Sequence, residues 1–208
     1  MRIVEMMTIA CMLIGAVATA QQVTDGLGDA LPAGATQRLG TLRMKYNSGV
    51  TDIAYLPDGR GLIASGANLD VWDLSTGTIE TTYKPTGGSM SSLNLSEDGQ
   101  RLLLISGGEV IEWSIAGQSV LHRFPTNQAG LVSVRYSPDE ARVLTAGRTP
   151  PTIKEFDLAS GEELISIQGT AAQFYKAVYG PGGKTAFVGT GFETVLAHYD
   201  LTTGALLS

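Results

Sequence analysis

Few residues in this chain of 208 residues could bind a metal ion or move a proton. The chain has two histidines, His122 and His198, and Glu112, Glu155 and His198 fall at matching positions of the strand repeats described below. Carboxylates and imidazoles together suit several divalent cations. Matching positions on neighbouring repeats, however, lie too far apart for ligands that must each sit about 2 Å from one ion. We therefore expect no metal site, and we expect His122 to be solvated.

Motifs for other chemistries are incomplete. Ser106-Gly107-Gly108 follows an expected strand but lacks the Gly-x-Ser-x-Gly elbow of a serine nucleophile. Gly180-Pro181-Gly182-Gly183 leads into an expected strand, whereas a phosphate-binding loop needs a helix N-terminus. The single cysteine, Cys11, permits neither an intrachain disulfide nor a cysteine-based metal site. The sequence thus favours a protein that is not an enzyme and has no cofactor.

The overall charge argues against nucleic acid as a partner. The net charge is −6 and no basic cluster stands out, while phosphate neutralisation supplies most of the affinity for nucleic acid.

The length of the chain allows one domain with a sizeable hydrophobic core. The 26 glycines gather at turns rather than in one run, which indicates many short elements and not a disordered linker.

Residues 1–20 have the pattern of a secretory signal peptide. Arg2 supplies positive charge, Met6 to Val17 is apolar, and Ala18-Thr19-Ala20 is a small-x-small cleavage site. The apolar run is shorter than the about 20 residues that a membrane anchor needs. Residues 21–38 are polar, without a period of 2 or 3.6, and are predicted to be a flexible lead-in. We expect an exported protein, periplasmic or secreted, with no stable membrane span after cleavage.

The remaining chain repeats one plan four times. From Val50 to Gly77, three short strands are separated by turns such as Pro57-Asp58-Gly59. Aligning on that turn places Asp58, Asp98, Asp139 and Gly182 at steps of 40, 41 and 43 residues, and it aligns an aromatic column of Trp72, Trp113, Phe156 and Tyr199. A fourth strand is expected at Thr78 to Lys84, Ser119 to Phe124 and Glu162 to Gln168, and it begins again at Ala205 to Ser208.

Four strands in each unit of about 40 residues are typical of the blades of a β-propeller. We predict an all-β domain at residues 39–208, with antiparallel four-stranded repeats at roughly 45–84, 85–124, 125–168 and 169–208. Strands between neighbouring blades bury both faces, which explains the unbroken apolar run Leu102-Leu103-Leu104-Ile105.

Val71-Trp72-Asp73-Leu74, preceded by Pro57-Asp58-Gly59, resembles the WD-repeat family of β-propellers, in the style of its exported bacterial members. The resemblance covers Leu39 to Ser208 and is weaker in the second and fourth repeats. It implies structural roles for the motif positions Trp72, Asp73, Trp113, Phe156, Asp157, Tyr199 and Asp200.

Two departures from the family pattern matter. The Gly-His pair that ties a loop to the central tryptophan is absent from all four repeats. We therefore expect these blades to rely on apolar packing.

The number of blades is the second departure, because four are few for this family. Three architectures are possible: a truncated product, half of an eight-blade ring made by two chains, or a tight four-blade ring. In the family, the strand expected at Leu39 to Lys45 would complete the last blade. We rank truncation first among these three architectures. The open blade edges of a truncated product would favour self-association.

The function that this resemblance implies is a non-catalytic scaffold for protein–protein interaction, with a protein partner of unknown identity. Propellers present binding groups on loops, and the large aromatic and cationic loop residues Tyr46, Arg148 and Phe192 are the candidates here. The alternatives are an exported propeller enzyme or cofactor binder, similar to the lactonase-like or quinoprotein-like propellers, and a gene remnant without function.

Overall fold

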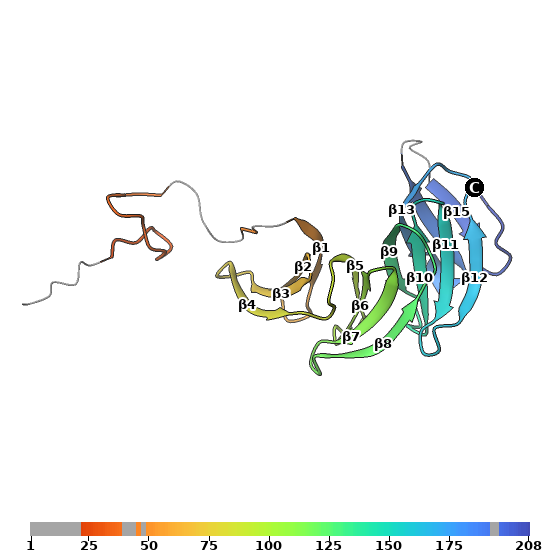
Figure 1. Ribbon diagram of the computed structural model, residues 1–208, viewed down its shortest axis with the longest axis horizontal. Coiled ribbons are helices and arrows are strands. Elements are labelled where there is room, and N and C mark those ends of the chain that lie inside the picture. Colours follow the sequence, from red (N-terminus) through yellow and green to blue (C-terminus); the bar gives the residue numbers. More distant parts are fainter. Residues whose placement is uncertain (1–21, 39–44, 47–48, 192–195) are drawn as a thin grey trace, which may run out of the picture. The chain divides into compact units, whose positions relative to one another are not determined.

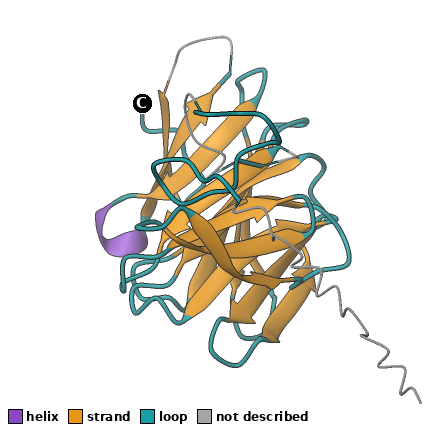
Figure 2. Ribbon diagram, turned by 90° about the vertical axis from the view of Figure 1, so that its left-hand side faces the viewer, coloured by secondary structure: helices purple, strands orange, loops and turns teal. Residues whose placement is uncertain are grey.

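The structure is a computed structural model that describes residues 22–38, 45–46, 49–191 and 196–208. It divides into two compact units, Met1–Leu42 and Arg43–Ser208. In the described residues, strands dominate and the only helix is one turn of 3₁₀ helix at Pro181–Gly183 (η1) (Figure 2). The described residues include no helix with the length and apolarity needed to cross a lipid bilayer. The predicted signal peptide lies outside the described residues, as does the strand expected at Leu39 to Lys45 except for Lys45 itself.

The second unit contains four antiparallel sheets, each made of strands that follow one another along the chain (Figure 1). Sheet 1 comprises β1 (Val50–Tyr55), β2 (Gly61–Ser65), β3 (Asn68–Asp73) and β4 (Thr78–Tyr83). Sheet 2 comprises β5 (Met90–Leu95), β6 (Arg101–Ser106), β7 (Glu109–Ser114) and β8 (Ser119–Pro125). Sheet 3 comprises β9 (Leu131–Tyr136), β10 (Arg142–Gly147), β11 (Thr152–Asp157) and β12 (Glu163–Gln168). Sheet 4 comprises β13 (Phe174–Tyr179), β14 (Thr185–Thr190) and β15 (Leu196–Asp200).

The all-β prediction and the repeated antiparallel sheets are confirmed, with strand bounds close to those expected. The last repeat differs, because its fourth strand does not form. Residues 205–208 instead make a single bridge, Tyr199 to Leu206, and two backbone hydrogen bonds between His198 and the residues Leu207 and Ser208. No closed propeller is formed by the described residues, since β1 and β15 leave their outward faces exposed.

Tight turns set the register within each sheet. In sheet 2, Gly99 has φ +69°, a left-handed backbone that glycine adopts without strain. A Cβ atom at Gly99 would lie 2.3 Å from Pro57 Cγ in the corresponding turn of sheet 1. Glycine at this turn therefore serves both the hairpin and the close contact between the two sheets.

The core consists of three apolar clusters, one at each junction between successive sheets. Sheets 1 and 2 share the cluster that includes Leu62, Leu69, Leu93 and Leu104. Sheets 2 and 3 share a second one, and sheets 3 and 4 share a third. Leu102 to Ile105 on β6 are all buried, so this central strand packs on both faces as predicted. The aromatic column, Trp72, Trp113, Phe156 and Tyr199, is buried as well.

The first unit is described only at residues 22–38, where Asp25 organises a local turn. Its carboxylate accepts hydrogen bonds from the backbone N–H groups of Leu27 and Asp29, both at 2.9 Å. The same carboxylate forms an ion pair of 2.7 Å with Arg38. The hydrogen bonds and the ion pair of Asp25 are therefore all made within residues 22–38.

Candidate functional site

Arg148 lies in the loop between β10 and β11, beside the first strand of the next sheet. Its guanidinium carbon is 4.6 Å from the centroid of the Tyr175 ring, a cation–π arrangement. None of the ion pairs between described residues involves Arg148, and its Nε is a buried atom without a hydrogen-bond partner there. Arg148 is half-buried and Tyr175 is 41% exposed, and we call these two side chains the Arg148 platform.

The backbone around the Arg148 platform is held by hydrogen bonds. The N–H of Arg148 donates to the carbonyl of Gly130 at 2.9 Å. Downstream in the same loop, the carbonyl of Pro151 accepts from the N–H of Gly169 at 2.8 Å and from the side-chain amide of Gln168 at 3.0 Å. A Cβ atom at Gly191 would come within 2.0 Å of the Tyr175 ring. The loop is thus anchored at both ends, and the ring has close backbone packing on one side.

Tyr46 belongs to a polar network inside sheet 1. Its hydroxyl accepts a hydrogen bond from Trp72 Nε1 at 2.6 Å and donates one to Asp70 Oδ2 at 2.8 Å. Asp70 also accepts from the hydroxyl of Thr82 at 2.5 Å. Burial, with the nearby Asp70 carboxylate, raises the pKa of Tyr46 well above its usual range. The hydroxyl of Tyr46 is engaged internally, so it joins a loop to the first tryptophan. Phe192 lies outside the described residues.

The acidic members of the repeat motif stabilise turns. The carboxylate of Asp73 accepts hydrogen bonds from the hydroxyl groups of Ser75 and Thr76, and these bonds lower its pKa to about 2. Asp157 is bonded in the same way to Ser160, and Asp200 to the backbone of Thr202 and Thr203. The pKa values of Asp157 and Asp200 are lowered too, chiefly by these bonds.

Two junctions contain an Arg–Glu–Tyr triad around a buried glutamate, which sequence reasoning missed. Between sheets 2 and 3, Glu112 Oε1 accepts from Arg101 at 3.1 Å and from the Tyr136 hydroxyl at 2.9 Å. Between sheets 3 and 4, Glu155 Oε1 accepts from Arg142 and from the Tyr179 hydroxyl, both at 2.9 Å. Burial raises the pKa of both tyrosines, and the neighbouring carboxylate raises it further.

The triads correct two expectations. The sheets do not rely on apolar packing alone, because Glu112 is 1% exposed and fully bonded at the centre of a junction. His122 is not simply solvated, since its Nδ1 lies 2.7 Å from Glu112 Oε2. The sequence carried a usable signal: Arg101, Glu112 and Tyr136 recur one repeat later as Arg142, Glu155 and Tyr179.

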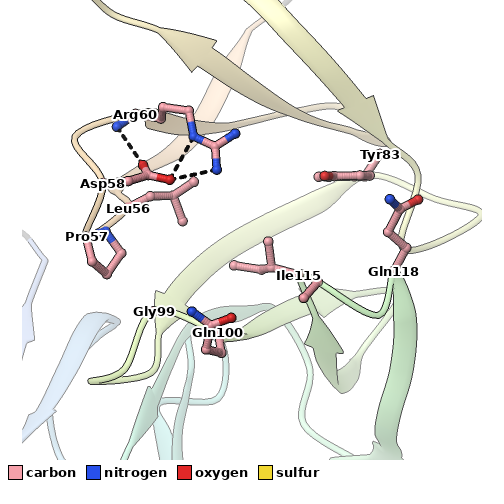
Figure 3. A pocket seen from close by; sticks show the side chains of 10 residues that line it. Leu56, Pro57, Asp58, Arg60, Tyr83, Gly99, Gln100, Ile115 and Gln118 are labelled. Carbon is pink, nitrogen blue, oxygen red and sulfur yellow. Dashed lines mark hydrogen bonds and ion pairs between the residues drawn. The ribbon is translucent and has the colours of Figure 1, made fainter.

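A cavity of about 290 Å³ lies between sheets 1 and 2, lined by Leu56, Pro57, Asp58, Arg60, Tyr83, Gly99, Gln100, Ile115, Ala116 and Gln118 (Figure 3). Arg60 stands at the repeat position of Arg101 and Arg142, because its carbonyl accepts from Leu56 N–H as theirs accept from Ser96 and Ser137. It turns instead to Asp58 at 2.7 Å and to Glu80 at 3.0 Å. The charged groups at this cavity are thus paired with one another at the surface.

The acidic and imidazole side chains do not gather around a common centre. No group of three or more His, Cys, Asp or Glu side chains within the described ranges could hold a metal ion. His198 instead stacks on Phe187, with ring centroids 4.0 Å apart. Nothing in the described residues indicates nucleic-acid binding, in keeping with the net charge of −6. Comparison with models of known protein families and with curated proteins gave no match.

Proposed function

We propose that the protein is an exported, non-catalytic β-propeller of the WD-repeat type that serves as a scaffold for protein–protein interaction. The observation that carries this proposal is the Arg148 platform, a preformed cation–π pair on an anchored loop. The repeated four-stranded antiparallel sheets and the buried aromatic column support the family assignment. The signal-peptide pattern of residues 1–20 supports export.

The chemistry of the platform supports an acidic partner. Arginine and tyrosine are over-represented among interface residues that dominate binding energy. Arg148 takes part in none of the ion pairs between described residues, so its guanidinium can form an ion pair with an aspartate or glutamate of a partner. The ring of Tyr175 holds the guanidinium in place, which reduces the side-chain entropy lost on binding. The partner is therefore a protein with an exposed acidic segment.

A comparison of two arginine variants tests the proposal. The tagged chain is used to capture proteins from the exported fraction, together with its Arg148→Ala and Arg123→Ala variants. Arg123 is a matched control, because it lies on the outer strand β8 and its guanidinium is 3.8 Å from Glu109 on the exposed surface. We expect one stoichiometric partner with the wild type and with Arg123→Ala, and at least about a tenfold loss of its binding with Arg148→Ala. Equal capture by all three proteins would contradict the proposal.

A further inference from the structure

The cavity between sheets 1 and 2 lies where side chains make close contact in the other two junctions (Figure 3). Between sheets 2 and 3, a Cβ atom at Gly161, in the turn after β11, would lie 2.8 Å from Phe124 Cβ on β8. Between sheets 3 and 4, a Cβ atom at Gly204 would lie 3.6 Å from Ile167 on β12. Tyr83 on β4 has the same register position as these two side chains. It instead lines a cavity of about 290 Å³.

Gln118 gives this cavity an unusual backbone feature. In sheets 1, 3 and 4, the residue five positions after the aromatic column is a glycine with φ between +68° and +74° (Gly77, Gly161 and Gly204). In sheet 2 this position is held by Gln118, which has φ +48°. A left-handed backbone is costly for a residue with a side chain, and such strain is concentrated at functional sites. The side chain of Gln118 lines the cavity, so the strained position supplies it with an amide group.

The polar groups that line the cavity are of two kinds. Arg60 is paired with Asp58 at 2.7 Å and with Glu80 at 3.0 Å, so the charges there balance one another. Gln100 and Gln118 add two neutral amides, and the hydrogen bonds that Gln100 makes within the described residues use its backbone. A side-chain amide carries both donors and an acceptor. The cavity therefore offers a ligand uncharged hydrogen-bonding groups rather than free charge.

Apolar surface forms the rest of the lining, with Leu56, Ile115 and the ring of Tyr83. Leu56 is buried, and Ile115 and Tyr83 pack against the apolar cluster shared by sheets 1 and 2. This part of the lining is thus held in place by the core. Tyr83 is half-buried, so part of its ring remains open to a ligand. The face of an aromatic ring carries partial negative charge, which attracts the C–H groups on one face of a sugar ring.

We propose that this cavity binds a neutral saccharide. Sugar hydroxyls both donate and accept hydrogen bonds, as the amides of Gln100 and Gln118 do. The C–H face of the sugar ring packs on Tyr83 and Ile115. The volume lies at the lower end of the range for ligand pockets, about 300–1,000 Å³, which suits a mono- or disaccharide. This inference does not depend on the Arg148 platform.

Titration calorimetry of the full chain tests the inference. The neutral probes are glucose, galactose, N-acetylglucosamine, maltose and cellobiose. Glucuronate serves as a charged saccharide, and N-acetyl-diglycine amide serves as a neutral peptide. We expect at least one neutral saccharide to bind with a dissociation constant below about 1 mM. Glucuronate and the peptide should bind at least about tenfold more weakly, because the cavity offers no free cation and its apolar lining suits a sugar ring.

Two variants replace cavity residues by those that other repeats carry. Gln118→Gly removes the amide, and Tyr83→Ile supplies the residue found at Ile167; each should raise the dissociation constant of the saccharide at least about tenfold. Gln118→Gly should keep or raise the melting temperature, because glycine relieves the left-handed strain.

Asn127→Gly is the matched control, because Asn127 also has a left-handed backbone, φ +52°, but does not line the cavity. Its dissociation constant should equal that of the wild type. Three results would each overturn the proposal: no binding of any neutral saccharide, tighter binding of the peptide than of every saccharide, or unchanged affinity in both cavity variants.

Discussion

The junction between sheets 1 and 2 differs from the next junction in the chemistry at its centre. In the first junction, Val71 and Leu95 stand where the second has Glu112 and Tyr136, and both are part of an apolar cluster or packed against it. The second junction contains a carboxylate that is 1% exposed and bonded to an arginine and a tyrosine. The same backbone arrangement thus accommodates both an apolar and an ionic centre.

The comparison shows how similar repeats can be kept in order. An apolar junction tolerates many apolar partners, whereas a buried carboxylate placed against the wrong sheet would lose the tyrosine hydroxyl that donates to it. Arg60 supports this view, because it occupies the arginine position of the triads and yet remains at the surface with Asp58 and Glu80. Without a glutamate at residue 71, the arginine has no buried partner. The triads therefore distinguish the later junctions from the first.

Removing the buried carboxylate should have the largest effect. Glu112→Ala leaves the buried Tyr136 hydroxyl without its acceptor, while Arg101 keeps its ion pair with Glu140, and we expect the free energy of unfolding to fall by about 3 kcal/mol. The matched change in the first junction, Val71→Ala, removes two carbon atoms from an apolar cluster and should lower it by about 2 kcal/mol. Urea unfolding of both variants measures the difference. Equal losses would show that the two junctions do not differ in the way described.

A smaller effect is expected from the turns, where the repeats also differ. Asp73, Asp157 and Asp200 accept hydrogen bonds in their turns, while the second repeat has Ser114 at this position. Because the folded pKa of Asp73 is lowered to about 2, its contribution is present above its ordinary pKa near 3.8 and is lost as the pH falls toward 2. Asp73→Asn should therefore weaken the dependence of stability on pH between pH 4 and 2. Urea midpoints across that range measure it, and an unchanged slope would contradict this role.

The strands and their grouping could be predicted from the sequence, because turns such as Pro57-Asp58-Gly59 and the aromatic column recur at a nearly constant period. The absence of the Gly-His pair predicts apolar packing alone, and this prediction overlooks the triads. Glu112 and Glu155 were considered together as metal ligands, although each pairs with an arginine of its own sheet. Their partners Tyr136 and Tyr179 come from the following repeat, so only the register between sheets places the three side chains together.

The internal hydrogen bonds of Tyr46 could not be predicted from the sequence for a different reason. It was selected as a loop aromatic for partner binding, and no sequence pattern links it to Trp72 and Asp70. That link depends on where the chain enters sheet 1, which the repeat period does not specify. The sequence identifies Arg148 as a loop residue but does not predict its contact with Tyr175, because Tyr175 comes from another sheet.

A double-mutant cycle across the second junction tests the central claim most directly. Glu112→Ala, Tyr136→Phe and the double variant are compared with the wild type in urea unfolding. Because the hydroxyl of Tyr136 donates to a charged carboxylate at 2.9 Å, we predict a coupling energy of about 1.5–3 kcal/mol between the two side chains. A coupling energy within about 0.5 kcal/mol of zero would show that the buried triad does not join sheets 2 and 3, and it would contradict the account.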